Sequence, residues 1–132
     1  MQITYLNNLT PDTEQIISLY ESAGLPRPTA DFERIKAMYE NSDVVITAWD
    51  GELLVGAARS ITDWVWSGYL ADLAVRDGYQ GTGIGKRLIE ITKERLGEKS
   101  TVLLLSVPGA MEYYPKIGFT KVENGFIIYR EK

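Results

Sequence analysis

The residues best suited to chemistry lie in a glycine-rich stretch in the second half of the chain. Four glycines, Gly78, Gly81, Gly83 and Gly85, fall within eight positions, and a segment with helical patterning, residues 86–96, follows directly. Glycine lets the backbone bend sharply and approach a ligand, and the first N–H groups of a helix favour negative charge. The stretch therefore predicts a site for a phosphate or pyrophosphate group that is bound mainly by main-chain amides.

Two common phosphate-binding motifs do not fit this stretch. A Walker A loop needs a glycine where Gln80 stands and a hydroxyl side chain where Arg87 stands. The G-x-G-x-x-G fingerprint of dinucleotide-binding folds also fails, because its third glycine position holds Lys86 or Leu88 in the two available registers. A nucleotide-binding fold is thus disfavoured, and tighter binding of ATP than of other phosphate esters would revive it.

A third motif does match. Gln80-Gly-Thr-Gly-Ile-Gly85 fits the pattern Gln/Arg-x-x-Gly-x-Gly/Ala; an apolar strand end, Leu73–Val75, precedes it, and the segment Ala110–Phe119 follows downstream. In these three elements the chain resembles the GNAT superfamily of N-acetyltransferases over roughly residues 43–130. The resemblance implies an α/β fold of the mixed α+β kind, with a central mixed sheet of about seven strands flanked by about four helices.

The resemblance also implies how acetyl-coenzyme A, the co-substrate of that family, would be held. The pyrophosphate would lie on the loop, and the pantetheine arm would pair with the main chain of a splayed strand. By resemblance, the Leu73 N–H would polarise the thioester carbonyl, which is commonly worth about 3 kcal/mol of barrier. No metal is expected. The predicted cofactor-binding residues are Leu73, Ala74, Val75, Gln80, Gly81, Thr82, Gly83, Ile84, Gly85 and Lys86.

By resemblance, Tyr114 is the predicted general acid, since it occupies the tyrosine position of the matched downstream segment. A phenol with a pKa near 10 can protonate the departing thiolate, which typically contributes about 10²–10⁴-fold. Pro115 follows directly, and proline clashes with a continuing helix, so the role could pass to Tyr113.

The general base is not fixed by the sequence. Some relatives carry a Glu four residues before the Leu73 position, and that position is Tyr69 here. Asp72 is the nearest acid, although strand alternation directs it to the face opposite Leu73 unless a bulge re-aims it. A chain of ordered water is the alternative. Direct attack by the acceptor amine is expected, because the chain has no cysteine and no activated nucleophile.

An acceptor pocket is expected where the connection 24–29 approaches the segment 62–68. Trp64 and Trp66, with Tyr69 nearby, are its candidate lining residues. Tryptophans two positions apart more often share one strand face and pack a core or a dimer contact.

Composition narrows the class of protein. The chain has 132 residues, no cysteine, no histidine and a net charge of −4. These values predict a single cytoplasmic domain over residues 1–132, without disulfides, histidine chemistry, nucleic-acid binding or membrane association. The expected partner is a small-molecule or peptide amine, and a homodimer is possible. The identity of the acceptor and the length of the acyl chain stay open. The alternative function is a catalytically inactive coenzyme A-binding module of the same fold.

Patterning supplies the elements that would position these residues. Helices are expected from Thr10-Pro11 to Ala23, from Thr29 to Tyr39, over residues 86–96 and near 109–114. The expected strands are 3–6, 44–49, 53–61, 64–75, 101–107, 119–122 and 126–130, with tight turns at Asp50-Gly51 and Asn124-Gly125.

Overall fold

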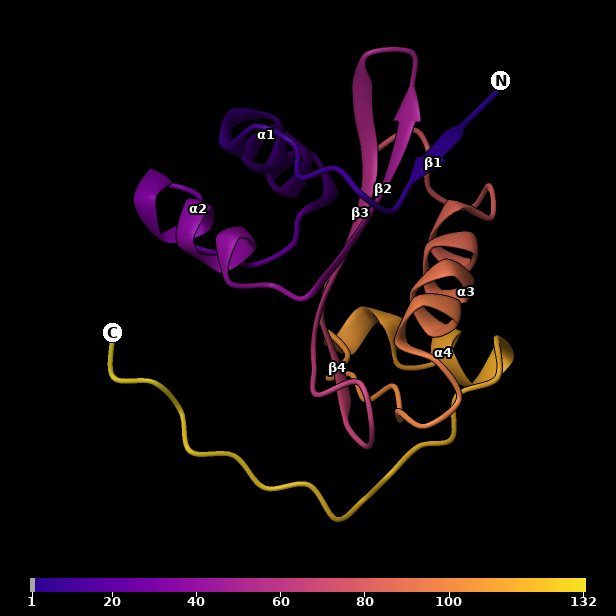
Figure 1. Ribbon diagram of the computed structural model, residues 1–132. Coiled ribbons are helices and arrows are strands. Elements are labelled where there is room, and N and C mark those ends of the chain that lie inside the picture. Colours follow the sequence, from indigo (N-terminus) through magenta and orange to yellow (C-terminus); the bar gives the residue numbers. More distant parts are fainter. Residues whose placement is uncertain (1) are drawn as a thin grey trace.

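The computed structural model describes residues 2–132 and consists of a twisted sheet with helices on both faces (Figure 1). None of the helices in these residues is both long and apolar enough to cross a membrane. In chain order the elements are β1 (Thr4–Leu6), α1 (Thr13–Ala23), α2 (Phe32–Glu40), β2 (Val44–Asp50), β3 (Leu53–Thr62), β4 (Gly68–Val75), α3 (Ile84–Leu96), a 3-10 turn (Pro108–Ala110) and α4 (Tyr113–Lys116).

Helices α1 and α2 begin two and three residues later, respectively, than the sequence patterns predict, because aspartates cap them. At α1 the Asp12 N–H donates to Gln15 Oε1 at 3.1 Å. At α2 the Asp31 side chain accepts from the Arg34 N–H at 3.1 Å. Both contacts are N-terminal capping interactions, which fix where a helix starts.

The sheet has the strand order β1-β2-β3-β4, and each strand is antiparallel to its neighbour. The β2–β3 hairpin turns at Asp50-Gly51, as the sequence predicts. Between β3 and β4 the register shifts by one residue: Arg59 pairs with Asp72, whereas Ser60 pairs with Leu70. The extra residue is Ala71, so β4 carries a β-bulge in its middle.

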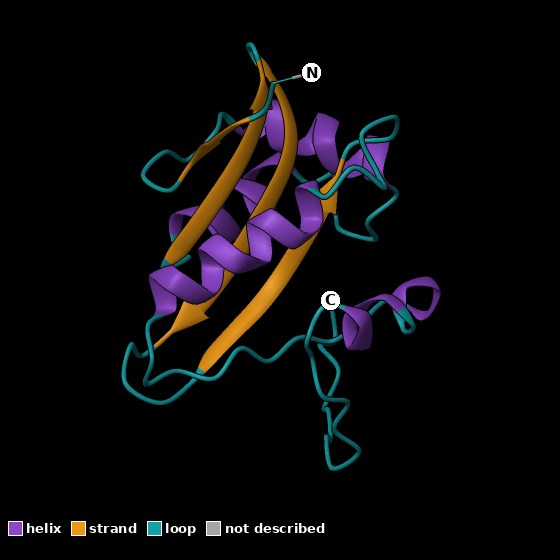
Figure 2. Cartoon of the chain, turned by 90° about the vertical axis from the view of Figure 1, so that its right-hand side faces the viewer, coloured by secondary structure: helices purple, strands orange, loops and turns teal. Residues whose placement is uncertain are grey.

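Each face of the sheet is covered by its own core. Figures 1 and 2 show α3 lying across one face, while α1 and α2 cover the other. On the α3 side Leu88 packs with Ile46 and Val55, and on the opposite side Leu19 packs with Ile35; all of these are fully buried. Amphipathic strands between two helical layers account for this division.

Residues 101–107, which follow α3, return beside β4 and run parallel to it. A parallel bridge joins Tyr69 to Leu103, and the Leu70 N–H donates to Leu103 O at 2.8 Å. Gly68 permits this approach, since a Cβ built on it would lie 2.5 Å from Thr101 O. The expected strand 101–107 is therefore not formed as a full strand: the segment makes one isolated parallel bridge to β4, and its pairing is limited to its start.

The fold class is confirmed, but the predicted count of about seven strands is wrong for the described residues, because the sheet has four. The expected strand pair 119–122 and 126–130 is not formed. This C-terminal segment (residues 119–132, yellow in Figure 1) runs apart from the sheet as extended chain, and its end returns toward α2, where Arg34 Nη2 donates to Lys132 O at 2.8 Å. Residues 120–132 are exposed. Strand patterning alone does not make a strand when no neighbouring strand lies within reach of its backbone groups.

Candidate active site

The glycine loop joins the end of β4 to the first turn of α3 and leaves that turn open. Gly83 is the N-cap of α3 with φ 91°, and no side chain caps the helix. A Cβ built on Gly83 would meet nothing within 4 Å, so the space in front of the helix is free. The first N–H groups of α3, which have no intrahelical acceptors, can therefore bind an anionic group.

Two predicted side chains of this loop brace the loop itself. Gln80 Nε2 donates to Val75 O at 2.9 Å, and Thr82 Oγ1 donates to Tyr79 O at 2.6 Å. Lys86 is exposed on the first turn of α3. With the Gln80 and Thr82 side chains so engaged, binding of a ligand mainly by main-chain amides of this loop stays a prediction.

The main chain of Leu73 points to the open side of β4. The Arg76 N–H donates to Val55 O at 2.8 Å, and bonded pairs alternate along an antiparallel ladder. From the observed register, Ala74 and Asp72 are then the residues bonded to β3, whereas the N–H and C=O groups of Leu73 and Val75 point away from β3.

The open side of β4 is a gap between two strands that diverge. Beside β4, residues 101–107 are bridged only at Tyr69–Leu103 within the part of the chain that the structure describes. Past this bridge the Leu73 amide faces the gap. An extended ligand chain could pair there with the backbone, which fits the predicted pantetheine site.

The two candidate tyrosines occupy different places. Tyr114 is half-buried against the α3-side core and packs edge-on to Phe119 at 5.5 Å between ring centroids. Tyr113 is 38% exposed, and its hydroxyl would lie 3.4 Å from a Cβ built on Gly85 in the first turn of α3. Burial raises the pKa of both phenols, and Tyr113 raises that of Tyr114 further. Both therefore stay protonated at neutral pH.

Pro115 does not disrupt the local helix. It stands in the first turn of α4, where a backbone N–H has no intrahelical partner in any case. The Phe119 N–H and the Ile117 N–H both donate to Tyr114 O at 3.1 Å. These two bonds fix the main chain of Tyr114 in this turn, and its role as general acid stays a prediction.

A cavity of about 610 Å³ lies on the α1–α2 side of β4. This volume is in the range of small-molecule sites. The connection between α1 and α2 forms one wall, β4 forms the floor, and the residues after the 101–107 bridge form another wall. The lining includes Pro26, Arg27, Pro28, Tyr69, Ala71, Asp72, Leu105, Ser106, Val107 and residues 130–132.

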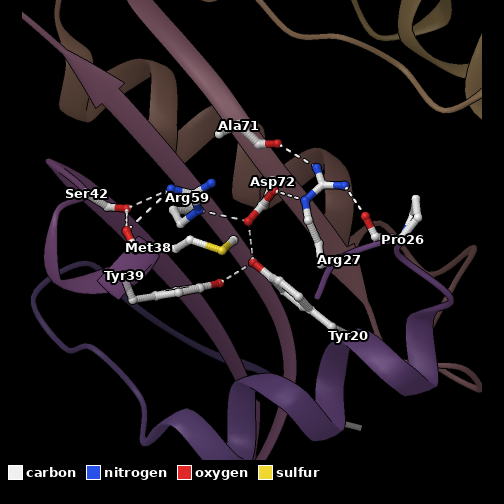
Figure 3. A network of polar contacts seen from close by, with 9 residues as sticks. All are labelled: Tyr20, Pro26, Arg27, Met38, Tyr39, Ser42, Arg59, Ala71 and Asp72. Carbon is white, nitrogen blue, oxygen red and sulfur yellow. Dashed lines mark hydrogen bonds and ion pairs between the residues drawn. The ribbon is translucent and has the colours of Figure 1, made fainter. Parts of the chain in front are cut away.

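Asp72 lies at the base of this cavity in a network of charged and phenolic groups (Figure 3). Its side chain is 1% exposed; Oδ1 accepts from Arg27 Nε at 2.6 Å, and Oδ2 accepts from Arg59 Nε at 2.8 Å. Tyr20 donates its hydroxyl proton to Asp72 Oδ2 at 2.7 Å. Because a hydroxyl has one proton, Tyr39, whose oxygen is 2.6 Å away, must donate to Tyr20.

This network determines the protonation state of Asp72. Burial by itself would raise the pKa of the carboxyl, but the bond from Arg59, with the charges of Arg59 and Arg27 and the Tyr20 hydroxyl, lowers it below its usual range. A carboxylate with a lowered pKa and occupied lone pairs is poorly suited to accept a proton from an amine. The geometry therefore favours a positioning role for Asp72 over the predicted role as base.

Asp72 also fixes the wall of the cavity. Arg27 lies in the Pro-Arg-Pro connection; its Nη1 donates to Pro26 O at 2.8 Å and its Nη2 to Ala71 O, the bulge residue, at 3.0 Å. The guanidinium thus ties the connection to the bulged part of β4. Despite the bulge, Asp72 points to the α1–α2 face, opposite the side on which Leu73 packs.

Of the three predicted acceptor-site residues, Tyr69 lines the cavity and the two tryptophans do not. Trp64 has φ 72° and lies with its ring 5.0 Å from the Arg95 guanidinium carbon, and Trp66 is 77% exposed. The turn that carries them is held by Asp63 Oδ1, which accepts three main-chain N–H groups of residues 65–67 at 2.8–3.0 Å. The predicted connection 24–29 does form a wall, but it faces β4 instead of this turn.

Sequence reasoning missed the network residues Arg27, Arg59, Tyr20 and Tyr39. Arg27 had a usable signal, because a cation between two prolines in a short connection is held in a stiff backbone. The other three carry no such signal, since a tyrosine on an apolar helix face or an arginine in a strand is ordinary core or surface patterning.

Comparison with known proteins now identifies the class. Residues 19–127 match the family model of the acetyltransferase (GNAT) domain, and the chain belongs to this family. The uncharacterized N-acetyltransferase ycf52 of Pyropia yezoensis is 30% identical over 118 residues, which are 84% of this chain and 66% of that protein. A ycf52-like relative of Prochlorococcus marinus is also 30% identical, over 88% of this chain and 67% of that protein. The chain thus spans about two thirds of the length of these relatives.

Solved structures agree on the fold. A probable acetyltransferase of Staphylococcus aureus superimposes with a TM-score of 0.84 at 24% identity, covering 98% of this chain and 100% of that one. A GNAT-family acetyltransferase of Streptococcus pneumoniae gives 0.82 at 25% identity, with 99% and 100% covered. AAC(6')-Iy, solved with a bisubstrate analogue of coenzyme A and acetylneamine, gives 0.72 at 14% identity, with 100% and 99% covered.

Proposed function

We propose that this GNAT domain transfers an acetyl group from acetyl-coenzyme A to a primary amine. The observation that carries the proposal is the uncapped first turn of α3, placed behind the glycine loop and beside the diverging edge of β4. A helix N-terminus suits a diphosphate, and unpaired strand amides suit the amide-containing pantetheine arm. The bisubstrate analogue bound by the structural relative supports the same donor.

In this proposal each group has one task. The coenzyme would supply an activated acetyl group as a thioester. The Leu73 N–H donates to the acetyl carbonyl oxygen, and Tyr114 donates its phenolic proton to the departing sulfur. The amine nitrogen forms the new bond to carbon as the carbon–sulfur bond breaks. The proton lost from nitrogen passes to water in the cavity, and water returns a proton to the Tyr114 phenolate. No covalent acetyl-enzyme is needed, because the amine attacks the thioester directly; the chain has no cysteine to carry one.

The acceptor would enter through the cavity beside Tyr69. Arg27 and Arg59 there are held by Asp72, so the cavity wall is rigid before any ligand arrives. Preorganised walls lower the ordering cost of binding. The acceptor class (polyamine, antibiotic, amino acid, peptide N-terminus or protein lysine) is a matter for a screen.

Release of free thiol from acetyl-coenzyme A, measured across a panel of such amines, tests the proposal. We expect turnover with at least one primary amine and none with the matching N-acetylated amine. Binding of coenzyme A without turnover on any amine would instead identify an inactive cofactor-binding module. Absence of coenzyme A binding would refute both.

A further inference from the structure

The cavity between the α1–α2 connection and β4 is positively charged, although the chain as a whole is acidic. Five of the residues that line it are cationic and two are acidic. The cations are Arg27, Arg34, Arg59, Arg130 and Lys132, and the acids are Asp72 and Glu131. The whole chain has a net charge of −4, so positive charge is concentrated here against the overall balance. A hollow lined mainly by one sign of charge attracts ligands of the opposite sign.

The floor of this cavity carries one positive charge in excess. Asp72 is a single carboxylate that accepts from Arg27 at 2.6 Å and from Arg59 at 2.8 Å, and the two guanidiniums lie on either side of it (Figure 3). Its third donor, the Tyr20 hydroxyl, is uncharged. A guanidinium is always charged in a protein, and Arg59 is only 9% exposed. Because buried charges are normally paired, this imbalance favours an anionic ligand on the floor.

Arg59 has donor capacity for such a ligand. Its Nε donates to Asp72, and its Nη1 donates to Ser42 Oγ at 3.2 Å with a longer contact to Met38 O at 3.4 Å. Within residues 2–132 its Nη2 makes no hydrogen bond. Nη2 is also not among the fully buried side-chain atoms that lack a partner in these residues. It is therefore accessible, and the cavity that Arg59 lines gives access to it.

Arg27 adds a second guanidinium that is already fixed in place. Three of its five N–H groups are used, by Asp72, Pro26 O and Ala71 O. Its side chain is 27% exposed, so the remaining N–H groups stay within reach of a ligand. Because Asp72 holds both arginines, their positions relative to each other are set before a ligand binds. Such preorganisation lowers the cost of binding a planar anion.

We propose that the acceptor is a small primary amine that also carries a carboxylate, as an amino acid does, and that this carboxylate binds Arg59 and Arg27 on the cavity floor. The inference rests on the proposed function, because it names the acceptor class of the same site. A carboxylate has the single negative charge that balances the floor, and it matches the planar donors of a guanidinium. Polyamines and aminoglycosides carry several positive charges, so the cationic lining repels them.

The same cavity gives the amine of such an acceptor a path to the reacting carbonyl. Its lining includes Ala71 of β4 together with Leu105 and Ser106 of the diverging segment, so it adjoins the gap that the Leu73 amide faces. Arg59 stands on β3, directly across from Asp72 on β4. Neighbouring strands lie about 4.8 Å apart, so a small molecule can extend from the floor to the gap. This favours an amine and a carboxylate that are separated by only a few bonds.

Matched pairs of acceptors test the proposal with the full wild-type chain. Thiol release from acetyl-coenzyme A is compared for α-, β- and ω-amino acids and for their primary amides. We expect kcat/KM to be about 10–100-fold higher for the best acid than for its amide, because the amide loses the charge-assisted hydrogen bonds. An α-amino amide has a lower amine pKa than its acid, so amine reactivity alone would favour the amide. Equal rates, or a preference for amides, polyamines or phosphoethanolamine, would overturn the proposal.

A substitution of Arg59 assigns the preference to the cavity floor. Arg59→Gln removes the excess charge and leaves Asp72 with Arg27 and Tyr20 as donors. The acid-over-amide ratio should fall at least about tenfold, chiefly through KM for the acid. Arg95→Gln makes the same chemical change at an exposed position near the end of α3 and should leave the ratio unchanged. An unchanged ratio in folded Arg59→Gln would contradict the assignment, and if this variant does not fold, the acceptor pairs decide with the wild type alone.

Calorimetry separates this inference from the proposed function. N-acetyl amino acids and their methyl amides are titrated into the wild type without acetyl-coenzyme A. We expect the acids to bind at least about tenfold more tightly than the amides, and equal binding would overturn the proposal. Turnover of amines without any preference for a carboxylate would refute this inference and leave the proposed function intact. Tighter binding of the acids by a protein that acetylates no amine would refute the function and support the carboxylate site.

Discussion

Replacing Asp72 with Asn tests the buried network most sharply, because it removes one charge and preserves shape. The carboxylate accepts bonds of 2.6, 2.7 and 2.8 Å, and its two arginine partners have side chains that are 27% and 11% exposed. Removing one member of a buried ion pair costs about 3–5 kcal/mol, since the other charge stays buried. Because a domain has about 5–15 kcal/mol in total, the variant should fold with a much smaller margin.

Urea denaturation measures this loss in free energy of unfolding, and the melting temperature should fall by about 10–20 °C. Glu40→Gln is the matched control, because it makes the same acid-to-amide change in an exposed pair with Lys36 at 3.6 Å. Such a pair is worth about 0.3–0.5 kcal/mol. A loss below about 1 kcal/mol in Asp72→Asn would refute the reasoning about a buried network.

The pH dependence of the free energy of unfolding also tests the buried network around Asp72. The pKa of Asp72 is lowered in the folded protein from its ordinary 3.8, so the unfolded chain takes up the proton first as pH falls. The stabilisation is therefore complete above pH 3.8 and is lost as pH falls toward the folded pKa. The wild type should show a steeper loss in this window than Asp72→Asn.

Activity of the same variant separates positioning from base catalysis. Loss of a general base would lower kcat by about 10²–10⁴-fold at a pH where the wild-type base is deprotonated. We expect instead a change of kcat below about tenfold, with a raised KM for the acceptor, when the assay temperature keeps the variant folded.

Three further predictions concern other parts of the molecule. Tyr114→Phe should lower kcat by about 10²–10⁴-fold, whereas Tyr113→Phe should chiefly raise the KM for acetyl-coenzyme A. Equal effects of the two substitutions on kcat in stopped-flow assays would contradict the assignment of Tyr114 as the general acid. Gly68→Ala should cost about 1–3 kcal/mol in urea denaturation, because its Cβ meets the Thr101 carbonyl at 2.5 Å, and an unchanged midpoint would mean that the 101–107 segment does not pair there. Burial raises the pKa of Tyr20 far above its ordinary 10.0, so as pH rises the Tyr20 hydroxyl loses its proton first in the unfolded chain. The free energy of unfolding should therefore fall as pH rises above 10.0, and denaturation midpoints of Tyr20→Phe should fall less steeply than those of the wild type.

The parts of the site that follow from local patterns could be predicted from the sequence. The glycine loop, the start of α3 and the β2–β3 turn depend on residues within one short stretch, so glycine spacing and apolar periodicity sufficed. The proline after Tyr114 also proved harmless for a local reason, its place in the first turn of α4.

The parts that depend on distant contacts could not be predicted. Asp72 meets Arg27 across 45 residues and Arg59 across 13, and nothing near Asp72 in sequence signals either arginine. The tryptophans were misplaced because Asp63 bonds fold their turn away from the cavity. The expected C-terminal strand pair is not formed, because strand propensity does not specify whether a neighbouring strand lies within reach.

The measurement that tests the central claim most directly is calorimetric titration of the protein with coenzyme A and with pantetheine, which lacks the diphosphate. If main-chain amides at the start of α3 bind the diphosphate, coenzyme A should bind at least about tenfold more tightly than pantetheine, and inorganic pyrophosphate should compete with it. Equal affinity for the two ligands, or no heat with coenzyme A, would contradict the account.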